Sequence, residues 1–382
     1  MSLSVPRSST IKVECLTTAA EVDGLAPEWQ ALFDRVDDAL PFAAYEWTAA
    51  WWAHLRSDSR GRRDALRLFV LRDGGGELFA VAPMMLTTWR VAGVPVVTVL
   101  QFIGTDPNIT ELRGMLVAPA REAEAVAALA AHVAHLRGFS WVQWCGLRQA
   151  SDAVTPLQSH GDAVVNKELS TFLLDMGESW DDFRKALPRN IRESLRKCYN
   201  SIARDGHEWS LRVAETPADV ALGVERLVDL HGKRAALDDT VRHRDCFDTP
   251  SARAFLGEVA GRFAARGMVR LFQIEVAGEV VSARLGFLFG TRLYLYYSGF
   301  DPAWGRYSVM TTAVAEALKY ATTHGVRSVN LSTGADESKL RWRPRPVRYV
   351  DAVVLRPGPR ARLSYQALSS RNPALLRIVP RT

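Results

Sequence analysis

The first half of the chain switches between the two-residue hydrophobic period of strands and the longer period of helices. Residues 66–71 and 78–87 alternate as two strands around an Asp-Gly-Gly-Gly turn, which predicts a hairpin. A further apolar strand is expected at 96–102, an alanine-rich helix at 121–136, and a short buried strand at 141–145. This half therefore predicts the order hairpin, strand, helix, strand.

The second half of the chain repeats this order. Residues 269–276 and 280–289 predict a hairpin, 293–300 a strand, 309–324 a helix and 326–332 a strand. The two hairpin sequences, LRLFVLRDGGGELFAVAPMML and VRLFQIEVAGEVVSARLGFLF, resemble each other along their length. A repeat of this length predicts two copies of one α/β domain.

A basic segment joins the two copies. After a strand expected at 169–175, the pattern predicts a long arginine-rich helix over about 180–205, which Pro188 should break or kink. Two further helices, at 217–236 and 250–266, open the second copy. The basic helix therefore lies between the two copies.

The composition indicates a folded protein larger than one ordinary domain. The chain has 382 residues, of which 48% are hydrophobic and 24% are charged. Its longest apolar run, at 91–104, is interrupted by glycine, proline and glutamine, and it is too short for a membrane helix. The N-terminal residues lack the apolar segment of a secretory signal, and the four cysteines form no CxxC pair. We therefore expect a reduced, cytoplasmic protein without a membrane span.

Positive charge is concentrated in two segments. The formal net charge is +6, yet residues 341–382 contain ten arginines and one acid, Asp351, which amounts to +9 for that segment alone. A second cluster lies on the expected basic helix, between residues 184 and 197. Such clusters either bind the phosphates of nucleic acid, nucleotide cofactors or lipid, or form a solvated surface. The sequence leaves both interpretations open.

Familiar catalytic and metal motifs are incomplete in this sequence. The tripeptide His-Arg-Asp at 243–245 matches the start of a kinase catalytic loop, but Pro250 stands where that loop requires asparagine. His132 and His135 lie one helical turn apart without an evident third ligand. The chain also has no P-loop and no GxGxxG. We therefore expect no metal site.

The passage from the strand at 293–300 into the helix at 309–324 is typical of an anion site. The connecting loop, DPAWGRYS, leads into a helix whose first turns are small and uncharged. Free backbone N–H groups at a helix start attract phosphate, Gly305 permits close approach, and Arg306 adds a positive charge. The loop suits a pyrophosphate, although an ordinary strand-to-helix turn has the same pattern.

These residues resemble those of the GNAT superfamily of acetyltransferases. The segment YYSGFDPAWGRYSVMTTAVAEALKYATTHGVRSVNLSTGADESKLRW is similar to the cellulose-biosynthesis (CelD/BcsL-like) acetyltransferases, as are the earlier segments PFAAYEWTAAWW and LPRNIRESLRK. That family is in turn similar to the peptidoglycan Fem transferases, which carry two acetyltransferase-like lobes. The resemblance implies an α/β fold of two tandem GNAT-like lobes, each a mixed central sheet flanked by helices.

The resemblance also implies a role for each lobe. Residues 1–165 are expected to form a degenerate N-terminal lobe on the acceptor side, because their counterpart of the phosphate loop, 117–122, lacks glycine and carries an acid. Residues 166–382 are expected to form a C-terminal lobe with the acyl-donor site and a basic tail, although its loop keeps only part of the acetyltransferase consensus. The implied co-substrate is acyl-CoA, most simply acetyl-CoA, with no metal. The donor-binding residues implied are Ser298, Trp304, Gly305, Arg306, Tyr307, Ser308 and Val309.

Acyl transfer to an amine needs a group that removes the amine proton and groups that stabilise the oxyanion. Strand alternation is expected to point one of Tyr296 and Tyr297 toward the thioester, and Tyr297 is the candidate for hydrogen bonding there. Fem-like enzymes place a functional lysine after the corresponding last strand, which implies Lys339 for oxyanion or phosphate contact and Asp336 as a base or orienting carboxylate. Asp106, in a polar loop of the first lobe, is expected to reach the acceptor amine.

The acceptor-side candidates come from three segments, namely Glu46 with Trp47, Arg189 with Arg192, and His231. For His231 the alternative is a structural role, which is more common for a lone histidine, and for the arginines it is a solvated surface. No cysteine lies near the expected site segments, so we expect direct transfer within a ternary complex rather than a covalent acyl-enzyme.

The sequence thus predicts an acyltransferase that moves an acetyl or other acyl group from acyl-CoA to an amine or hydroxyl of a small-molecule or saccharide acceptor. The alternative enzyme is a Fem-like transferase that takes an aminoacyl group from tRNA, because the basic helix and tail suit a tRNA backbone. An alternative of another class is a non-catalytic protein that binds nucleic acid or anionic polysaccharide through the same surfaces.

Overall fold

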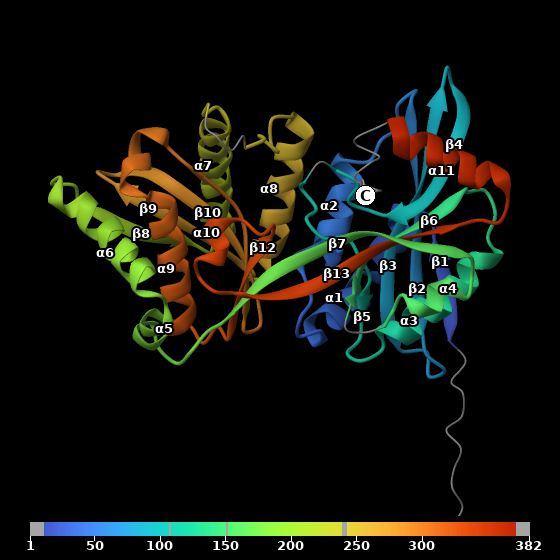
Figure 1. The fold of residues 1–382 in the computed structure, drawn as a ribbon, viewed down its shortest axis with the longest axis horizontal. Coiled ribbons are helices and arrows are strands. Elements are labelled where there is room, and N and C mark those ends of the chain that lie inside the picture. The colour runs from blue at the N-terminus through green and yellow to red at the C-terminus, as the bar shows by residue number, and fades with distance from the viewer. Residues whose placement is uncertain (1–10, 107, 150–151, 239–242, 372–382) are drawn as a thin grey trace, which may run out of the picture.

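The computed structural model describes residues 11–106, 108–149, 152–238 and 243–371. Within these ranges a single 13-stranded sheet runs through the molecule in the order β1-β2-β3-β4-β6-β13-β7-β12-β11-β10-β9-β8, with the short strand β5 paired to β3. Figure 1 shows two lobes side by side and two long strands that run from one lobe to the other.

The N-terminal lobe starts with an edge strand and two helices and continues as an antiparallel hairpin. Strands β1 to β4 pair antiparallel in sequence order, and β4 pairs parallel to β6. Its elements are β1 (Lys12–Leu16), α1 (Ala19–Arg35), η1 (Pro41–Ala43), α2 (Tyr45–His54), β2 (Arg62–Arg72), β3 (Leu78–Val91), β4 (Val94–Phe102), β5 (Leu116–Val117), α3 (Glu122–His135), β6 (Trp141–Arg148) and α4 (Thr155–Gln158).

The C-terminal lobe has the same pairing order. Strands β8 to β11 pair antiparallel in sequence order, and β11 pairs parallel to β12. This agreement between the lobes confirms the predicted repeat. The elements of this lobe are β8 (Trp209–Ala214), α7 (Pro217–Ala235), α8 (Pro250–Ala265), β9 (Val269–Val276), β10 (Glu279–Phe289), β11 (Arg292–Phe300), η3 (Pro302–Tyr307), α9 (Val309–Thr323), β12 (Ser328–Thr333) and α10 (Glu337–Leu340).

Each lobe is completed by a strand that the sequence attaches to the other lobe. β7 (Asp162–Asp175) follows the N-terminal lobe along the chain but pairs with β12, whereas β13 (Arg345–Leu355) follows the C-terminal lobe but pairs with β6. The two exchanged strands also pair with each other along most of their length, as Figure 1 shows. The expected boundary after residue 165 therefore falls inside β7.

The hydrophobic pattern missed three strands wholly or in part, and two of them, β7 and β13, are the exchanged strands. β1 was not expected, β7 begins seven residues before the expected 169–175, and the segment expected to be a basic tail contains β13 and the helix α11 (Pro359–Arg371). The first part of β7 is half exposed and polar, with Val164 and Val165 on the surface, and the start of β13 carries exposed arginines. Their pairing partners are distant in sequence, so no local hydrophobic alternation marks them.

Pro188 divides the basic segment as predicted. Helix α5 (Trp180–Ala186) ends before the proline, and α6 (Arg189–Arg204) begins after it, with Pro188 at its N-cap. Proline lacks the N–H that a continuous helix would need at this point, so the chain starts a new helix there. No helix of the described residues is long and apolar enough to cross a membrane.

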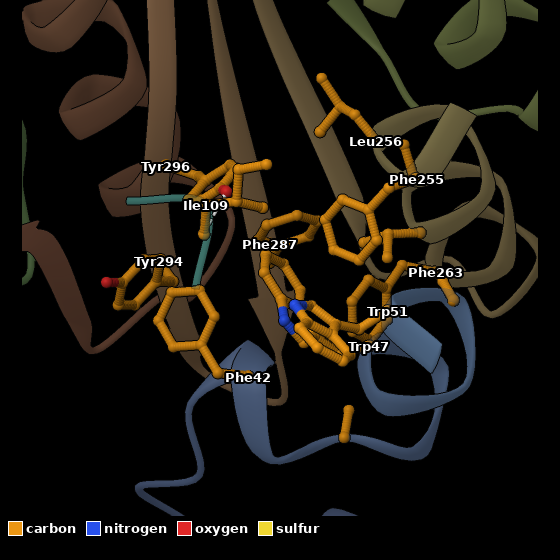
Figure 2. Close-up of a cluster of buried hydrophobic side chains, with 14 of the residues drawn as sticks. Phe42, Trp47, Trp51, Ile109, Phe255, Leu256, Phe263, Phe287, Tyr294 and Tyr296 are labelled. Carbon is orange, nitrogen blue, oxygen red and sulfur yellow. Dashed lines mark hydrogen bonds between the residues drawn. The ribbon is translucent and has the colours of Figure 1, made fainter. Parts of the chain in front are cut away.

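The two lobes share a buried aromatic core, shown in Figure 2. The Trp47 ring of α2 packs edge-on against Phe255 of α8 and Tyr296 of β11, with ring centroids 5.1 and 5.6 Å apart. Beside this core, Arg266 at the end of α8 pairs with Glu46 at 2.7 Å and with Asp34 at 2.8 Å. Apolar burial and ion pairs therefore join the N-terminal helices to the C-terminal sheet.

Candidate active site

Strands β11 and β12 part in the middle of the C-terminal lobe. They pair in parallel only over Arg292–Tyr294 and Ser328–Asn330, although β11 continues to Phe300 and β12 to Thr333. Beyond these residues no ladder joins the two strands in the described chain. Polar side chains from both lobes meet at this point. We call it the strand junction, and its side chains are those of Glu111, Arg284, Tyr294, Ser332 and Lys339.

A β-bulge changes the direction of the tyrosines on β11. The register with β10 shifts so that Tyr296 and Tyr297 both lie opposite Leu285. Their rings are edge to face with centroids 4.7 Å apart, and their hydroxyls donate to Ile109 O at 2.5 Å and Asn108 O at 2.8 Å. The expectation that alternation points only one of them to the site is therefore wrong, because the bulge interrupts the alternation.

Glu111 of the N-terminal lobe enters the strand junction, and the sequence reasoning missed it. Ser332 Oγ donates to Glu111 Oε1 at 2.7 Å, and the Tyr294 hydroxyl donates to Glu111 Oε2. Burial raises the pKa of the Glu111 carboxyl, while these hydrogen bonds and the nearby charges of Lys339 and Arg284 oppose the rise. Glu111 is thus a buried carboxyl with a fixed orientation and a raised pKa.

Lys339 and Asp336 lie together beside this carboxyl, on the short helix α10. Lys339 Nζ is 3.0 Å from Asp336 Oδ2 and also donates to Thr333 O at the end of β12. Burial opposes ionisation of Asp336, but the hydrogen bonds from Ser338 and Lys339 outweigh it and lower the pKa of Asp336. The structure therefore brings these two predicted residues to the junction as an ion pair.

Arg284 of β10 is a second junction residue that the sequence reasoning missed. Its Nη2 donates to Ser298 Oγ at 3.1 Å and its Nη1 to Tyr296 O at 3.4 Å, while its buried Nε has no hydrogen-bond partner. Burial and the neighbouring charge of Arg234 lower the pKa of Arg284 to about 10. This guanidinium carries positive charge toward the junction without a directly bonded carboxylate in the described chain.

Tyr297 lies in a cluster with Cys246 and His231. The Tyr297 hydroxyl lies 3.1 Å from Cys246 Sγ. His231 is 4% exposed; its Nδ1 donates to Ser298 O at 3.1 Å, so its Nε2 accepts from the backbone N–H of Cys246 at 3.4 Å. The expectation that no cysteine lies near the site is wrong, because the loop before α8 folds back over β11.

Cys246 is nevertheless held as a thiol. Burial raises its pKa, although the hydrogen bond with Tyr297 and the charge of Arg244 act in the opposite direction. A nucleophilic cysteine needs a lowered pKa to populate the thiolate. Cys246 is thus a poor nucleophile in this position, and direct transfer stays a prediction.

Asp106 fixes the polar loop of the N-terminal lobe. Its two carboxylate oxygens accept from Thr110 N at 2.8 Å, Thr110 Oγ1 at 2.7 Å and Trp51 Nε1 at 2.8 Å. Burial raises the pKa of Asp106 against the opposing effect of these hydrogen bonds. The loop that Asp106 holds contains Asn108 and Ile109, whose carbonyls accept from the two tyrosines.

The expected phosphate loop forms the 3₁₀ turn η3 and the start of α9. Gly305, Arg306 and Ser308 are exposed, and Ser308 has a left-handed backbone with φ of 55°. Tyr307 and Val309 are core side chains, so only their backbone can face a ligand. The ring of Trp304 packs against His207 and the ring of Tyr307, with centroids 5.0 and 5.5 Å apart.

The structure places the acceptor-side candidates in three different surroundings. Trp47 and Glu46 are 1% and 2% exposed and belong to the packing between the lobes, so a substrate cannot reach them without displacing that core. Arg189 and Arg192 lie on the exposed face of α6, opposite its buried face, and Arg189 pairs with Glu193 at 2.8 Å. His231 lies against Tyr297 and Ser298 of β11. In the described ranges no three His, Cys, Asp or Glu side chains cluster as a metal site would require.

Comparison with known proteins agrees with this architecture. Residues 189–340 match the family profile described as an acetyltransferase (GNAT) domain. A crystal structure of FemX superposes with a TM-score of 0.62 at 12% identity, over 94% of this chain and 99% of that chain. The C-terminal domain of an Agrobacterium fabrum protein described as a lysylphosphatidylglycerol synthetase gives 0.51 at 13% identity, over 92% and 97%. No curated protein matches this chain in sequence.

These matches confirm the predicted GNAT fold. The matched profile runs from α6 to α10 and so contains β11, η3, α9 and β12, the elements around the strand junction. The more specific resemblance to the cellulose-biosynthesis acetyltransferases stays a prediction.

Proposed function

We propose that this protein is an acyltransferase that moves an acyl group from acyl-CoA, most simply acetyl-CoA, directly to an amine or hydroxyl acceptor. The observation that carries the proposal is the buried Glu111 carboxyl, held by Tyr294 and Ser332 where β11 and β12 part. Acyl transfer needs a base at the acceptor and positive charge at the acyl oxygen. At the junction Glu111, from the loop between β4 and β5, is a candidate base, and Lys339 and Arg284 of the matched GNAT domain carry positive charge.

Glu111 is the proposed general base. A base works best when its pKa approaches the operating pH, and burial raises the pKa of this carboxyl. Its hydrogen bonds to Tyr294 and Ser332 fix its orientation, so the ionised form can accept the proton of the acceptor amine as the new C–N bond forms. Asp336, the base considered from the sequence, is less suited because Lys339 and Ser338 lower its pKa.

Tyr297, Lys339 and Arg284 are proposed to act on the acyl donor. Burial and the neighbouring Cys246 keep the pKa of Tyr297 well above its ordinary value, so its phenol stays protonated. By turning from Asn108 O, its hydroxyl can donate a hydrogen bond to the departing thiolate. Lys339 and Arg284 are positioned to stabilise the acyl oxygen as charge develops on it. Ser298 orients Arg284 through their 3.1 Å hydrogen bond.

The donor is proposed to bind along η3 and the start of α9. The exposed Gly305, Arg306 and Ser308 offer backbone N–H groups and a guanidinium to a pyrophosphate, with the backbone of Tyr307 and Val309 beside them. Trp304 stabilises the turn by packing on His207.

Aminoacyl-tRNA is the second candidate donor, and one observation favours it. Arg189, Arg192 and Arg196 form an exposed row on α6, which belongs to the same lobe as the junction. Such a row suits a nucleic acid backbone, whereas the short turn at Gly305 suits the compact pyrophosphate of CoA. If CoA is the donor, binding should depend on Arg306 of η3, whereas if aminoacyl-tRNA is the donor, binding should depend on the arginines of α6.

Calorimetric titration with acetyl-CoA tests the proposal. We expect saturable binding that Arg306→Ala weakens by about 1–3 kcal/mol, because a charge-assisted hydrogen bond to phosphate is lost. Arg189→Ala is the matched control, since it removes an equally exposed arginine outside η3, and its affinity for acetyl-CoA should equal that of the wild type. Absence of binding to the folded protein, or equal loss in both variants, would contradict the CoA assignment and favour a test with charged tRNA.

A further inference from the structure

A cavity of about 530 Å³ lies between the lobes, and no residue of η3, the proposed donor site, lines it. Its walls come from the exchanged strands β7 and β13, the paired ends of β11 and β12, and the loop before η1. Small-molecule sites in proteins have volumes of roughly 300–1,000 Å³ and often lie where domains meet. The cavity is therefore large enough for a metabolite-sized ligand.

The ionisable lining of this cavity is strongly positive. Four arginines, Arg148, Arg292, Arg345 and Arg348, and one acid, Asp38, line it. Arg148 pairs with Asp38, and Arg345 pairs with Asp175 at 2.9 Å. In the described chain neither Arg292 nor Arg348 has an ion pair within 4 Å. The lining thus holds more guanidinium groups than carboxylates, which favours an anionic ligand.

The rest of the lining is mostly apolar, with Gln149, Thr171 and Asn330 as uncharged polar residues, and it reaches the strand junction. Leu40, Phe289 and Val347 supply apolar surface, so the cavity suits a ligand with both an anionic group and a hydrophobic body. Tyr294 also lines the cavity, and its hydroxyl donates to Glu111. One side chain therefore contacts both the cavity and the proposed base.

A second cavity of about 420 Å³ continues along the N-terminal lobe. It shares Asp38, Ala39, Leu40, Arg148 and Tyr349 with the first cavity, so the two adjoin. A ligand longer than the first cavity therefore has room to extend over β5 and the start of α3.

We propose that the first cavity is the acceptor site and that the acceptor carries a carboxylate or a phosphate, bound by Arg292 and Arg348. This inference rests on the proposed acyl transfer, because it places the acceptor's nucleophile next to Tyr294, whose hydroxyl donates to Glu111. The anionic group lies at the arginine end, the hydrophobic body packs on Leu40 and Val347, and the amine or hydroxyl faces the junction.

The test titrates the full-length protein, without any acyl donor, with phenyl phosphate and with benzoate, and follows binding by calorimetry and ligand-observed NMR. Benzyl alcohol is the neutral probe of similar shape. We expect saturable binding of at least one anion and weaker binding of the alcohol. The anion that binds more tightly identifies the group as phosphate or carboxylate.

Variants locate the binding in the cavity. The double variant Arg292→Gln/Arg348→Ala should weaken anion binding about tenfold or more, as expected when charge-assisted hydrogen bonds are lost. Arg348→Ala alone removes an exposed side chain and should weaken binding in a fully folded protein. Arg60→Ala/Arg226→Ala removes two exposed arginines outside the cavity and should leave anion affinity unchanged.

Two outcomes would overturn the inference, namely equal affinity for the anions and benzyl alcohol, or unchanged anion binding in the Arg292 and Arg348 variants. The titration does not involve acetyl-CoA, so it can fail while the donor still binds, and the donor test can fail while the anions still bind. The two proposals are therefore tested separately.

Discussion

Gly299 sets the distance between helix α7 and strand β11. A Cβ at this position would lie 2.3 Å from His231 N and 2.4 Å from the carbonyl carbon of Leu230. Both contacts are with backbone, which cannot move aside as a flexible side chain can. The close approach places His231 where its ring meets Tyr297, with centroids 5.2 Å apart.

We predict that Gly299→Ala destabilises the protein by about 1–3 kcal/mol or more, because α7 must shift away from the sheet. Chemical denaturation measures the free energy of unfolding. The matched control is Gly257→Ala in helix α8, where a Cβ has no atom within 4 Å, and this variant should gain roughly 0.5–1 kcal/mol through helix propensity. Equal stability of the two variants would contradict the packing argument.

The raised pKa of Glu111 predicts the pH dependence of catalysis. The base is active as the carboxylate, so kcat/KM should fall as pH falls through its pKa. Because burial raises that pKa, the acid limb should lie above the ordinary glutamate value of about 4.3. Glu111→Gln should lower kcat/KM by about 100-fold or more and remove this limb.

The measurement is kcat/KM across pH 5–9, monitored by thiol release from acetyl-CoA with an identified acceptor. Glu337→Gln serves as the control, since Glu337 is an exposed carboxylate on α10, and its pH profile should follow the wild type. A Glu111→Gln enzyme with wild-type kcat/KM would exclude Glu111 as the base.

At the scale of elements, one carboxylate organises the loop between β4 and β5. Asp106 accepts three hydrogen bonds, from the backbone and side chain of Thr110 and from Trp51 of α2. The loop then presents the carbonyls of Asn108 and Ile109 to the bulged strand β11. The loop therefore links α2, β4 and β11 across the lobe boundary.

We predict that Asp106→Ala costs on the order of 2–4 kcal/mol of stability, because the Trp51 and Thr110 donors lose their acceptor in a buried place. Thermal unfolding with calorimetric analysis checks this value. Asp37→Ala, which removes an exposed aspartate of the same lobe, should change stability by less than about 0.5 kcal/mol. Near-equal stability of the two variants would show that the three hydrogen bonds contribute little.

At the scale of the whole molecule, strand exchange makes the lobes interdependent. β13 closes the N-terminal sheet against β6, and β7 extends the C-terminal sheet against β12. Neither lobe has its full sheet without residues that the sequence attaches to the other lobe. The aromatic core around Trp47 adds buried apolar surface across the same boundary.

We therefore predict that the protein unfolds in one cooperative transition, with equal calorimetric and van't Hoff enthalpies. A chain of residues 1–158 contains every strand of the N-terminal lobe except β13, so the edge of β6 is open and Trp141 and Trp144 lose part of their cover. We expect no cooperative melting and weak near-ultraviolet circular dichroism from this fragment. Two separate transitions of the full chain, or a folded fragment, would contradict interdependence.

The sequence by itself determined the order of elements in each copy, the repeat and the break at Pro188. These features depend on local hydrophobic period, on turn residues and on the N–H that proline lacks, all of which act within a few residues. The anion-type turn at Gly305 was accessible for the same reason, whereas the GNAT fold and the choice of Lys339 and Asp336 came from the resemblance to known families.

The tertiary structure decided the rest of the candidate site. Glu111 lies 183 positions from its partner Tyr294, and Cys246 lies 51 positions from Tyr297, so nothing near either residue along the chain marks the contact. The bulge that turns both tyrosines to one side is a register shift between two strands, and the exchange of β7 and β13 is a choice of pairing partner. Both depend on burial summed over the whole sheet, which a local pattern does not contain.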